Sequence, residues 1–263
     1  WHWKRFFDLQ EHWLPRHAAA VTVASRTLQS QIWGLGVPPE RVFYAPNCPR
    51  ASLLSARDRV SATDRARVRQ HLGIGPAPML IFVGNISLGD DLDLALVALQ
   101  RVRKHVPEVK LVIVGTGDGL PRLRALTADL SLHDTVHFAG WIEHQQVPAY
   151  LTAADIAIYP YRDTLINRAK CSIKILEYMT MGKAIVTTRV GQNLEYLEHG
   201  RSGILAEPGD ANAFAQALIE LLADPDLARR LGRNAAQRIQ DRFTWSHHIP
   251  TIEQAYRLAL EQG

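Results

Sequence analysis

The chain has 263 residues, of which 47% are hydrophobic and 21% charged, a composition typical of a soluble globular protein with a sizeable core. Its formal net charge of +4 is a mild excess that gives no reason to expect a nucleic-acid partner. No apolar run approaches the roughly 20 residues of a membrane span. Two cysteines, Cys48 and Cys171, are too few for a disulfide framework and indicate a reducing, cytoplasmic compartment.

The first fifty residues alternate helix and strand. The expected elements are a helix over Trp3–His17, a strand over Ala20–Ala24, a helix over Thr27–Trp33 and a strand over Val42–Ala45. Two such units cannot close a domain. Because the chain also starts at Trp1 rather than Met, we expect residues 1–49 to be the end of a partial second α/β domain whose earlier part is missing.

Aromatic and basic residues at the start of the chain, Trp1, Trp3, Lys4 and Arg5, also allow peripheral contact with the inner face of a membrane. Packing of this helix on the missing domain explains them equally well. The Arg-rich residues 50–77 are expected to form a linker that leads into a surface helix.

From Met79 onward, short apolar strands alternate with amphipathic helices. The expected strands are Met79–Gly84, Lys110–Gly115, Thr135–Gly140, Asp155–Pro160, Ala184–Thr188 and Gly203–Ala206. Repeated strand–helix units predict an α/β domain with a Rossmann-like, doubly wound parallel sheet. We assign residues 78–244 to this domain, and residues 245–263 to a helix that returns toward the N-terminal part.

Basic residues gather in the segment that begins near Ala169. We expect Arg168, Lys170 and Lys174 in a loop before a helix that carries Glu177. This helix should stop at Gly182 and lead into a buried strand. In an α/β sheet such a place offers a helix N-terminus to a ligand, and cations there favour a phosphate.

Glu177 is the acid of this segment that we expect to act in the site. If Lys174 and Glu177 both lie near the start of this helix, their spacing of three residues sets them on one face. A buried carboxylate needs hydrogen-bond donors, and ribose hydroxyls are suitable ones. The alternative is an ion pair of Lys174 and Glu177 on the helix surface.

Glycines follow two of the expected strands. Gly84 and Asn85 come after the first, and Gly115, Thr116 and Gly117 after the second. Glycine lets a backbone approach a ligand closely, although Gly84 also fits a routine strand-to-helix turn. The second run resembles a dinucleotide fingerprint, but its third glycine is one place early and no acid closes the next strand. A tight turn is therefore favoured over an oxidoreductase.

No metal or cofactor is expected. Asp91-Leu92-Asp93 has the form of a metal-binding Asp-x-Asp, but it opens a helix, where acids favour the positive end of the dipole. The histidines have no spacing typical of metal ligands.

The segment Glu177–Val186 resembles the nucleotide-sugar loop of retaining glycosyltransferases with the GT-B fold, whose pattern is Glu-x-Met-x-x-Gly-x-x-Val-Val. Residues 140–155 and 191–210 are similar to further segments of that family. The resemblance implies a GT-B fold and transfer of a sugar, with retention of configuration, from a UDP- or GDP-linked donor. It also implies that the acceptor domain is largely missing from this chain.

The resemblance assigns catalytic roles to Glu177 and Lys174, and donor binding to these two residues together with Gly84, Asn85, Gly115, Thr116, Gly117, Arg168 and Lys170. The chain departs from the family at three places: Asn85 and Asp90 replace basic residues, and Ala169 replaces a first glutamate. Arg162, Arg168, Lys170 and Lys174 would then hold the phosphates. A non-catalytic glycosyltransferase-like module, and a nucleotide-sugar epimerase or hydrolase, remain alternatives.

Overall fold

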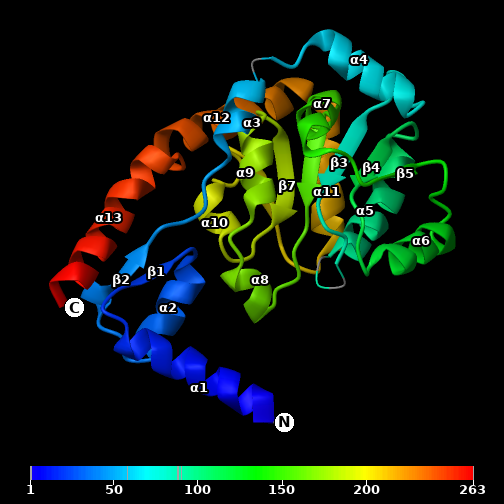
Figure 1. Ribbon diagram of the computed structural model, residues 1–263. Coiled ribbons are helices and arrows are strands. Elements are labelled where there is room, and N and C mark those ends of the chain that lie inside the picture. The colour runs from blue at the N-terminus through cyan, green and yellow to red at the C-terminus, as the bar shows by residue number, and fades with distance from the viewer. Residues whose placement is uncertain (1, 58, 88, 90, 263) are drawn as a thin grey trace.

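The computed structural model describes residues 2–262 apart from positions 58, 88 and 90, so the expected role of Asp90 lies outside the described residues. Its main sheet has six parallel strands in the order β5-β4-β3-β6-β7-β8 (Figure 1). These are β3 (Met79–Val83), β4 (Lys110–Val114), β5 (Val136–Gly140), β6 (Ile156–Tyr159), β7 (Ala184–Thr188) and β8 (Ile204–Ala206). All lie within one residue of their predicted ends, and the doubly wound parallel sheet is confirmed.

Helices join and cover the strands of this sheet. They are α5 (Leu92–His105), α6 (Leu120–Asp129), α7 (Val147–Ala153), α8 (Leu165–Ala169), α9 (Ile173–Thr180), α10 (Asn193–Tyr196), α11 (Ala211–Ala223) and α12 (Pro225–Arg242). α5 packs against α11, and α9 against α12. Every residue of β3 and β7 is buried, because helices cover both faces, and this explains their continuous apolar sequence.

The strand order reverses beside β3. From β3 the chain moves outward through β4 to β5, and then crosses back to β6 on the other side. In open α/β sheets ligands bind outside the carboxyl ends of the strands at such a reversal. The topology therefore predicts a ligand site among the loops that follow β3, β4 and β6.

A smaller parallel sheet precedes the main one. It contains β1 (Val21–Val23) and β2 (Val42–Tyr44), accompanied by α1 (His2–His17), α2 (Arg26–Gly34) and the short helix η1 (Pro39–Arg41). It has its own small core, which includes Val23, Val37 and Val42. Helix α13 (Trp245–Gln262) returns to contact both strands. The domain boundaries stay a prediction.

Hydrogen bonds join the smaller sheet to the main domain. The Asn47 side-chain amide donates to the Cys171 carbonyl over 3.0 Å. Gln192 accepts from the Arg26 backbone N–H over 3.3 Å and donates to the Tyr44 hydroxyl. The residues on the main-domain side belong to the segments that follow α8 and β7, so the junction lies next to the carboxyl edge of the sheet.

The segment expected to be a linker packs instead on the main domain. It forms α3 (Ala51–Arg57) and α4 (Ala62–His71), and Leu53 and Val68 belong to the main core. The buried Arg69 guanidinium donates to the carbonyls of Ala153, Gly75 and Ala77. A buried guanidinium needs such partners, and the sequence pattern did not reveal them.

The proposed membrane contact concerns residues 1–5, whose side chains lie outside the described part of the structure. Within the described residues, every helix is too short or too polar to cross a bilayer.

Helix α9 is fastened to β3 through one tyrosine, which yields a test of the fold. The buried Tyr178 hydroxyl accepts from the Val83 N–H over 2.7 Å and donates to the Val83 carbonyl over 3.1 Å. Tyr178→Phe leaves both backbone groups unsatisfied, so we expect a loss of about 1–3 kcal/mol in the free energy of unfolding. Urea denaturation measures it. Tyr256→Phe, at a position 69% exposed, is the matched control, and equal effects of the two substitutions would contradict this account.

Candidate functional site

A cavity of about 290 Å³ opens at the carboxyl edge of the main sheet, beyond the ends of β3 and β4. The turn after β3 contributes Gly84 and Asn85, and the turn after β4 contributes Gly115 and Thr116. Helix α9 contributes Lys174. The remaining lining comes from the strand ends and the segment after β5: Val83, Val114, Trp141, Ile142, His144 and Val147.

The two glycine turns are held together backbone to backbone. The Gly84 N–H donates to the Val114 carbonyl over 3.0 Å, and the Ile86 N–H to the Thr116 carbonyl over 2.9 Å. A Cβ on Gly115 would lie 1.8 Å from the Gly84 carbonyl oxygen, a distance that no side chain tolerates, and the φ of Gly115 is +133°. The interpretation of this glycine run as a tight turn is confirmed.

Gly117 belongs to the same turn but does not line the cavity. A Cβ at this position would lie 2.1 Å from the Ile86 carbonyl oxygen. The close approach of the β3 loop therefore explains why position 117 requires a glycine. The contact of Gly117 with a ligand stays a prediction.

Lys174 and Glu177 form an ion pair in α9. The Lys174 ammonium lies 2.9 Å from a Glu177 carboxylate oxygen. The Glu177 side chain is only 3% exposed, whereas that of Lys174 is 28% exposed and reaches the cavity. The pair is therefore no surface pair. The buried acid holds the lysine in place, and Lys174 lies in the first turn of α9 rather than in the loop where we expected it.

The other predicted cations lie outside the cavity lining. Arg168, in the last turn of α8, makes two hydrogen bonds of 2.5 and 2.6 Å to the Asp163 carboxylate, which lower the pKa of that acid. Lys170 ends α8, and its ammonium lies 5.4 Å from the centroid of the Tyr161 ring. The expected cluster is thus divided between two helices, with only Lys174 at the cavity.

Arg162, which we expected to help with phosphate, is bound to the acids of the Asp-x-Asp sequence. Its guanidinium lies 3.3 Å from Asp91 and 3.1 Å from Asp93. Asp93 also accepts from Arg122 over 2.5 Å. Burial raises the pKa of Asp91 although Arg162 opposes the shift. Asp91 precedes α5 and Asp93 lies in its first turn, as predicted, and arginines also pair with both acids.

The resemblance covers residues 140–155, but the expected donor-binding residues did not include Trp141 and His144, which follow β5 and line the cavity. Trp141 is 66% exposed, and His144 begins the short helix η2 (His144–Gln146). The positive φ of Gly140, +71°, turns the chain at the strand end. The signal available in the sequence was a tryptophan directly after the glycine that ends an expected strand.

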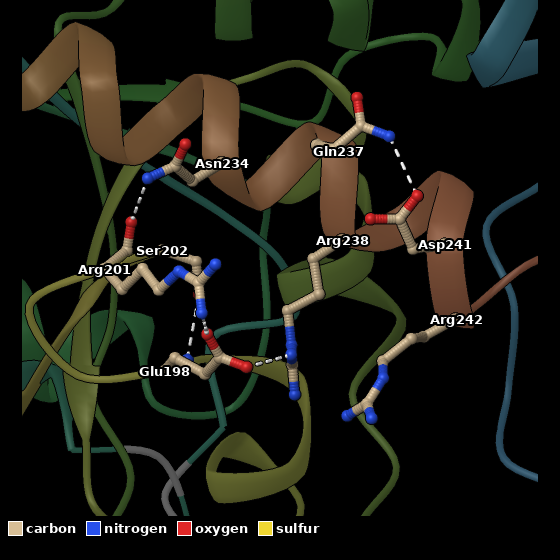
Figure 2. Close-up of a pocket in the computed structure, with 8 residues that line it drawn as sticks. All are labelled: Glu198, Arg201, Ser202, Asn234, Gln237, Arg238, Asp241 and Arg242. Carbon is tan, nitrogen blue, oxygen red and sulfur yellow. Dashed lines mark hydrogen bonds and ion pairs between the residues drawn. The ribbon is translucent and has the colours of Figure 1, made fainter.

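A second pocket, of about 290 Å³, lies between α12 and the loop after α10 (Figure 2). Its charged groups mostly satisfy one another. Glu198 pairs with both Arg201 and Arg238, and Gln237 donates to Asp241 over 2.8 Å. Arg238 also donates to the Tyr196 carbonyl over 2.8 Å. The contacts of Arg238 attach α12 to α10 and the loop after it, so we assign this pocket a structural role.

Residues 77–224 match the family described as Glycosyl transferases group 1. This match covers more than half of the chain, which therefore belongs to that family. The chain is 27% identical over 241 residues to the alpha-D-kanosaminyltransferase of Streptomyces kanamyceticus, covering 89% of this chain and 60% of the relative. It is 29% identical over 183 residues to a GDP-mannose-dependent alpha-(1-6)-phosphatidylinositol monomannoside mannosyltransferase of Mycolicibacterium smegmatis, covering 69% of this chain and 48% of the relative.

Solved structures show the same fold. Sucrose-phosphate synthase from Thermosynechococcus elongatus superposes with a TM-score of 0.80 at 24% identity, covering 96% of this chain and 61% of that structure. Anabaena HepE in complex with UDP-glucose gives 0.75 at 21% identity, with 94% and 64% covered. The C-terminal domain of a group 1 glycosyltransferase (LpcC) from Francisella tularensis gives 0.61 at 21% identity, with 71% and 97% covered. These likenesses confirm the predicted GT-B fold.

The ion pair in α9 gives a prediction about stability. Lys174→Met leaves a buried carboxylate without its cation and should lower the free energy of unfolding by about 3 kcal/mol. In the double variant, Lys174→Met with Glu177→Gln, the buried carboxylate is also replaced by a neutral amide. This variant should therefore recover most of the stability that Lys174→Met alone loses. Urea denaturation of the single and double variants measures the coupling. If the loss of stability in the double variant equals the sum of the losses in the two single variants, the buried ion pair does not exist as described.

Proposed function

We propose that this chain carries the donor-binding part of a glycosyltransferase that takes a sugar from a nucleoside diphosphate, with retention of configuration, and passes it to an acceptor. The observation that carries the proposal is the carboxyl-edge cavity, where two glycine turns and Lys174 face one space. Membership of the glycosyltransferase family supports it. The chain spans between 48% and 60% of the length of the two relatives described above, and we place the acceptor site in the remainder of such a protein.

The chemistry of this cavity suits a diphosphate leaving group. Cleavage of the bond to the sugar builds positive charge on the ring and negative charge on the departing diphosphate. Groups that are already oriented stabilise this charge best. Lys174 is oriented by the buried Glu177, and the turns after β3 and β4 bring backbone close to the same space. Arg168 and Lys170 would join the site only after rearrangement of their present contacts.

The relatives suggest which donors to test. One relative is named for its dependence on GDP-mannose, and one similar structure holds UDP-glucose. The nearby Trp141 offers an aromatic face of the kind on which a base stacks. We propose a uridine or guanosine diphosphate sugar as the donor.

A non-catalytic module is the second candidate, because two of the arginines expected to bind phosphate already form ion pairs with acids of this chain. Asp163 pairs with Arg168, and Asp91 and Asp93 pair with Arg162. Such a module would keep the fold and would lack donor binding.

Donor binding is tested by calorimetric titration of the purified chain with UDP, GDP, ADP and their sugars. We expect one uridine or guanosine nucleotide to bind, and Lys174→Ala to weaken that binding about tenfold to a hundredfold through loss of a charge-assisted hydrogen bond. Lys110→Ala is the control, because Lys110 opens β4 at the opposite edge of the sheet. Circular dichroism verifies that each variant is folded.

Two outcomes contradict the proposal. If no nucleotide or nucleotide sugar binds, the non-catalytic module is the better account. If a nucleotide binds and Lys174→Ala binds it as tightly as the parent, the cavity is not the donor site. Release or epimerisation of the sugar without an acceptor would assign the chain to a hydrolase or epimerase instead.

A further inference from the structure

A third cavity, of about 360 Å³, lies at the amino edge of the main sheet, away from the carboxyl-edge cavity. It is bounded by the starts of β6 and β7, the end of α11 and the first turn of α12. Three cationic residues, Arg65, Lys183 and Arg229, and one acidic residue, Asp155, line it. Its apolar lining includes Leu221, Leu222 and Ala228. A cavity of this size is large enough for a small organic molecule.

Lys183 follows the glycine that ends α9 and extends into this region. Its ammonium donates to the Ala154 carbonyl over 2.8 Å. In the described residues Lys183 makes no ion pair within 4 Å, and Asp155 is the acid that influences it. Burial, followed by the charge of Arg65, lowers the pKa of Lys183 to about 8. The amine is therefore held in surroundings that disfavour its charge.

The surrounding charges are strongly unbalanced. Asp155 accepts from Arg65 and Arg69, each over 2.8 Å, and also from the Met79 N–H. One carboxylate thus serves two guanidinium groups as well as the lysine. Among the described residues, the ion-pair partner of Arg229 is the highly exposed Asp226 of its own helix turn, and an Arg57 guanidinium lies close to Gly182. An anion in the cavity would relieve this excess of positive charge.

We propose that this amino-edge cavity binds a small organic carboxylate with an apolar body. The carboxylate would lie beside Lys183 and Arg229, and the body would lie against Leu221, Leu222 and Ala228. The apolar wall favours an organic acid over inorganic phosphate, which would leave these side chains uncovered. The site is separate from donor binding, since the two cavities lie at opposite edges of the sheet.

The test uses the lysines as reporters, with hexanoate as the probe. The chain is acetylated at pH 8 with sulfosuccinimidyl acetate, with and without hexanoate, and labelling is followed by peptide mass spectrometry. A bound carboxylate raises the pKa of Lys183, and a rise of one unit lowers its neutral, reactive fraction at this pH about fivefold. We expect hexanoate to slow labelling of Lys183 by at least that factor and to leave Lys110 unchanged.

Acetate, butanol and inorganic phosphate define the specificity. Acetate has a carboxylate but no extended apolar chain, and butanol has an apolar chain but no charge. Both should therefore protect Lys183 less than hexanoate does. Arg229→Ala, an exposed position, should weaken protection by hexanoate in a folded protein. Equal protection by acetate or phosphate would overturn the apolar subsite. Absence of protection by hexanoate, or protection unaffected by Arg229→Ala, would overturn the proposal.

The lowered pKa of Lys183 also predicts a pH dependence. Between about pH 8 and the ordinary lysine value of 10.5, the unfolded chain binds a proton at Lys183 that the folded chain does not bind. The contribution of this residue to the free energy of unfolding therefore rises with pH across that interval. Urea denaturation at pH 7.5 and pH 10 should show the parent gaining stability relative to Lys183→Met. Lys110→Met is the control, and a difference that is constant with pH contradicts the prediction.

Discussion

The closeness of the β3 and β4 turns is the constraint on which the candidate site depends. The Gly84 carbonyl occupies the space that a side chain at Gly115 would need, and backbone hydrogen bonds join the two loops. Tyr178 then ties the end of β3 to α9, the helix that carries Lys174 and Glu177. These backbone and tyrosine contacts consequently connect the glycine turns to the helix that carries the lysine.

Local patterns in the sequence were sufficient to predict most of the fold. Continuous apolar runs gave the strands of the main sheet, and the spacing of Lys174 and Glu177 placed both on one helix face. Contacts between distant segments were not predictable in this way. Asp91 and Arg162 are far apart in the sequence, yet they form an ion pair. Arg69 is buried because carbonyls from α7 and the turn before β3 surround it, and composition alone suggested a linker there.

The structure brings some of the predicted site residues to the carboxyl-edge cavity and leaves others outside its lining. The segment around α9 does supply a lysine to the cavity, because the helix begins at the carboxyl edge of the sheet. Arg168 was expected beside it, but Asp163, five residues earlier, binds its guanidinium. The choice between a neighbouring acid and a ligand depends on side-chain geometry that a linear pattern does not contain. The resemblance included Trp141 in a similar segment, but its place at the cavity depends on the turn at Gly140, which a linear pattern does not contain.

The hydrogen bonds at the junction have a mechanical consequence. Asn47 holds the Cys171 carbonyl, three residues before Lys174, and Tyr44 and Arg26 both engage Gln192. Any swing of the small sheet about this joint must pull on the start of α9 or break these bonds. A movement of the small sheet that keeps these bonds would therefore displace the segment that leads into Lys174.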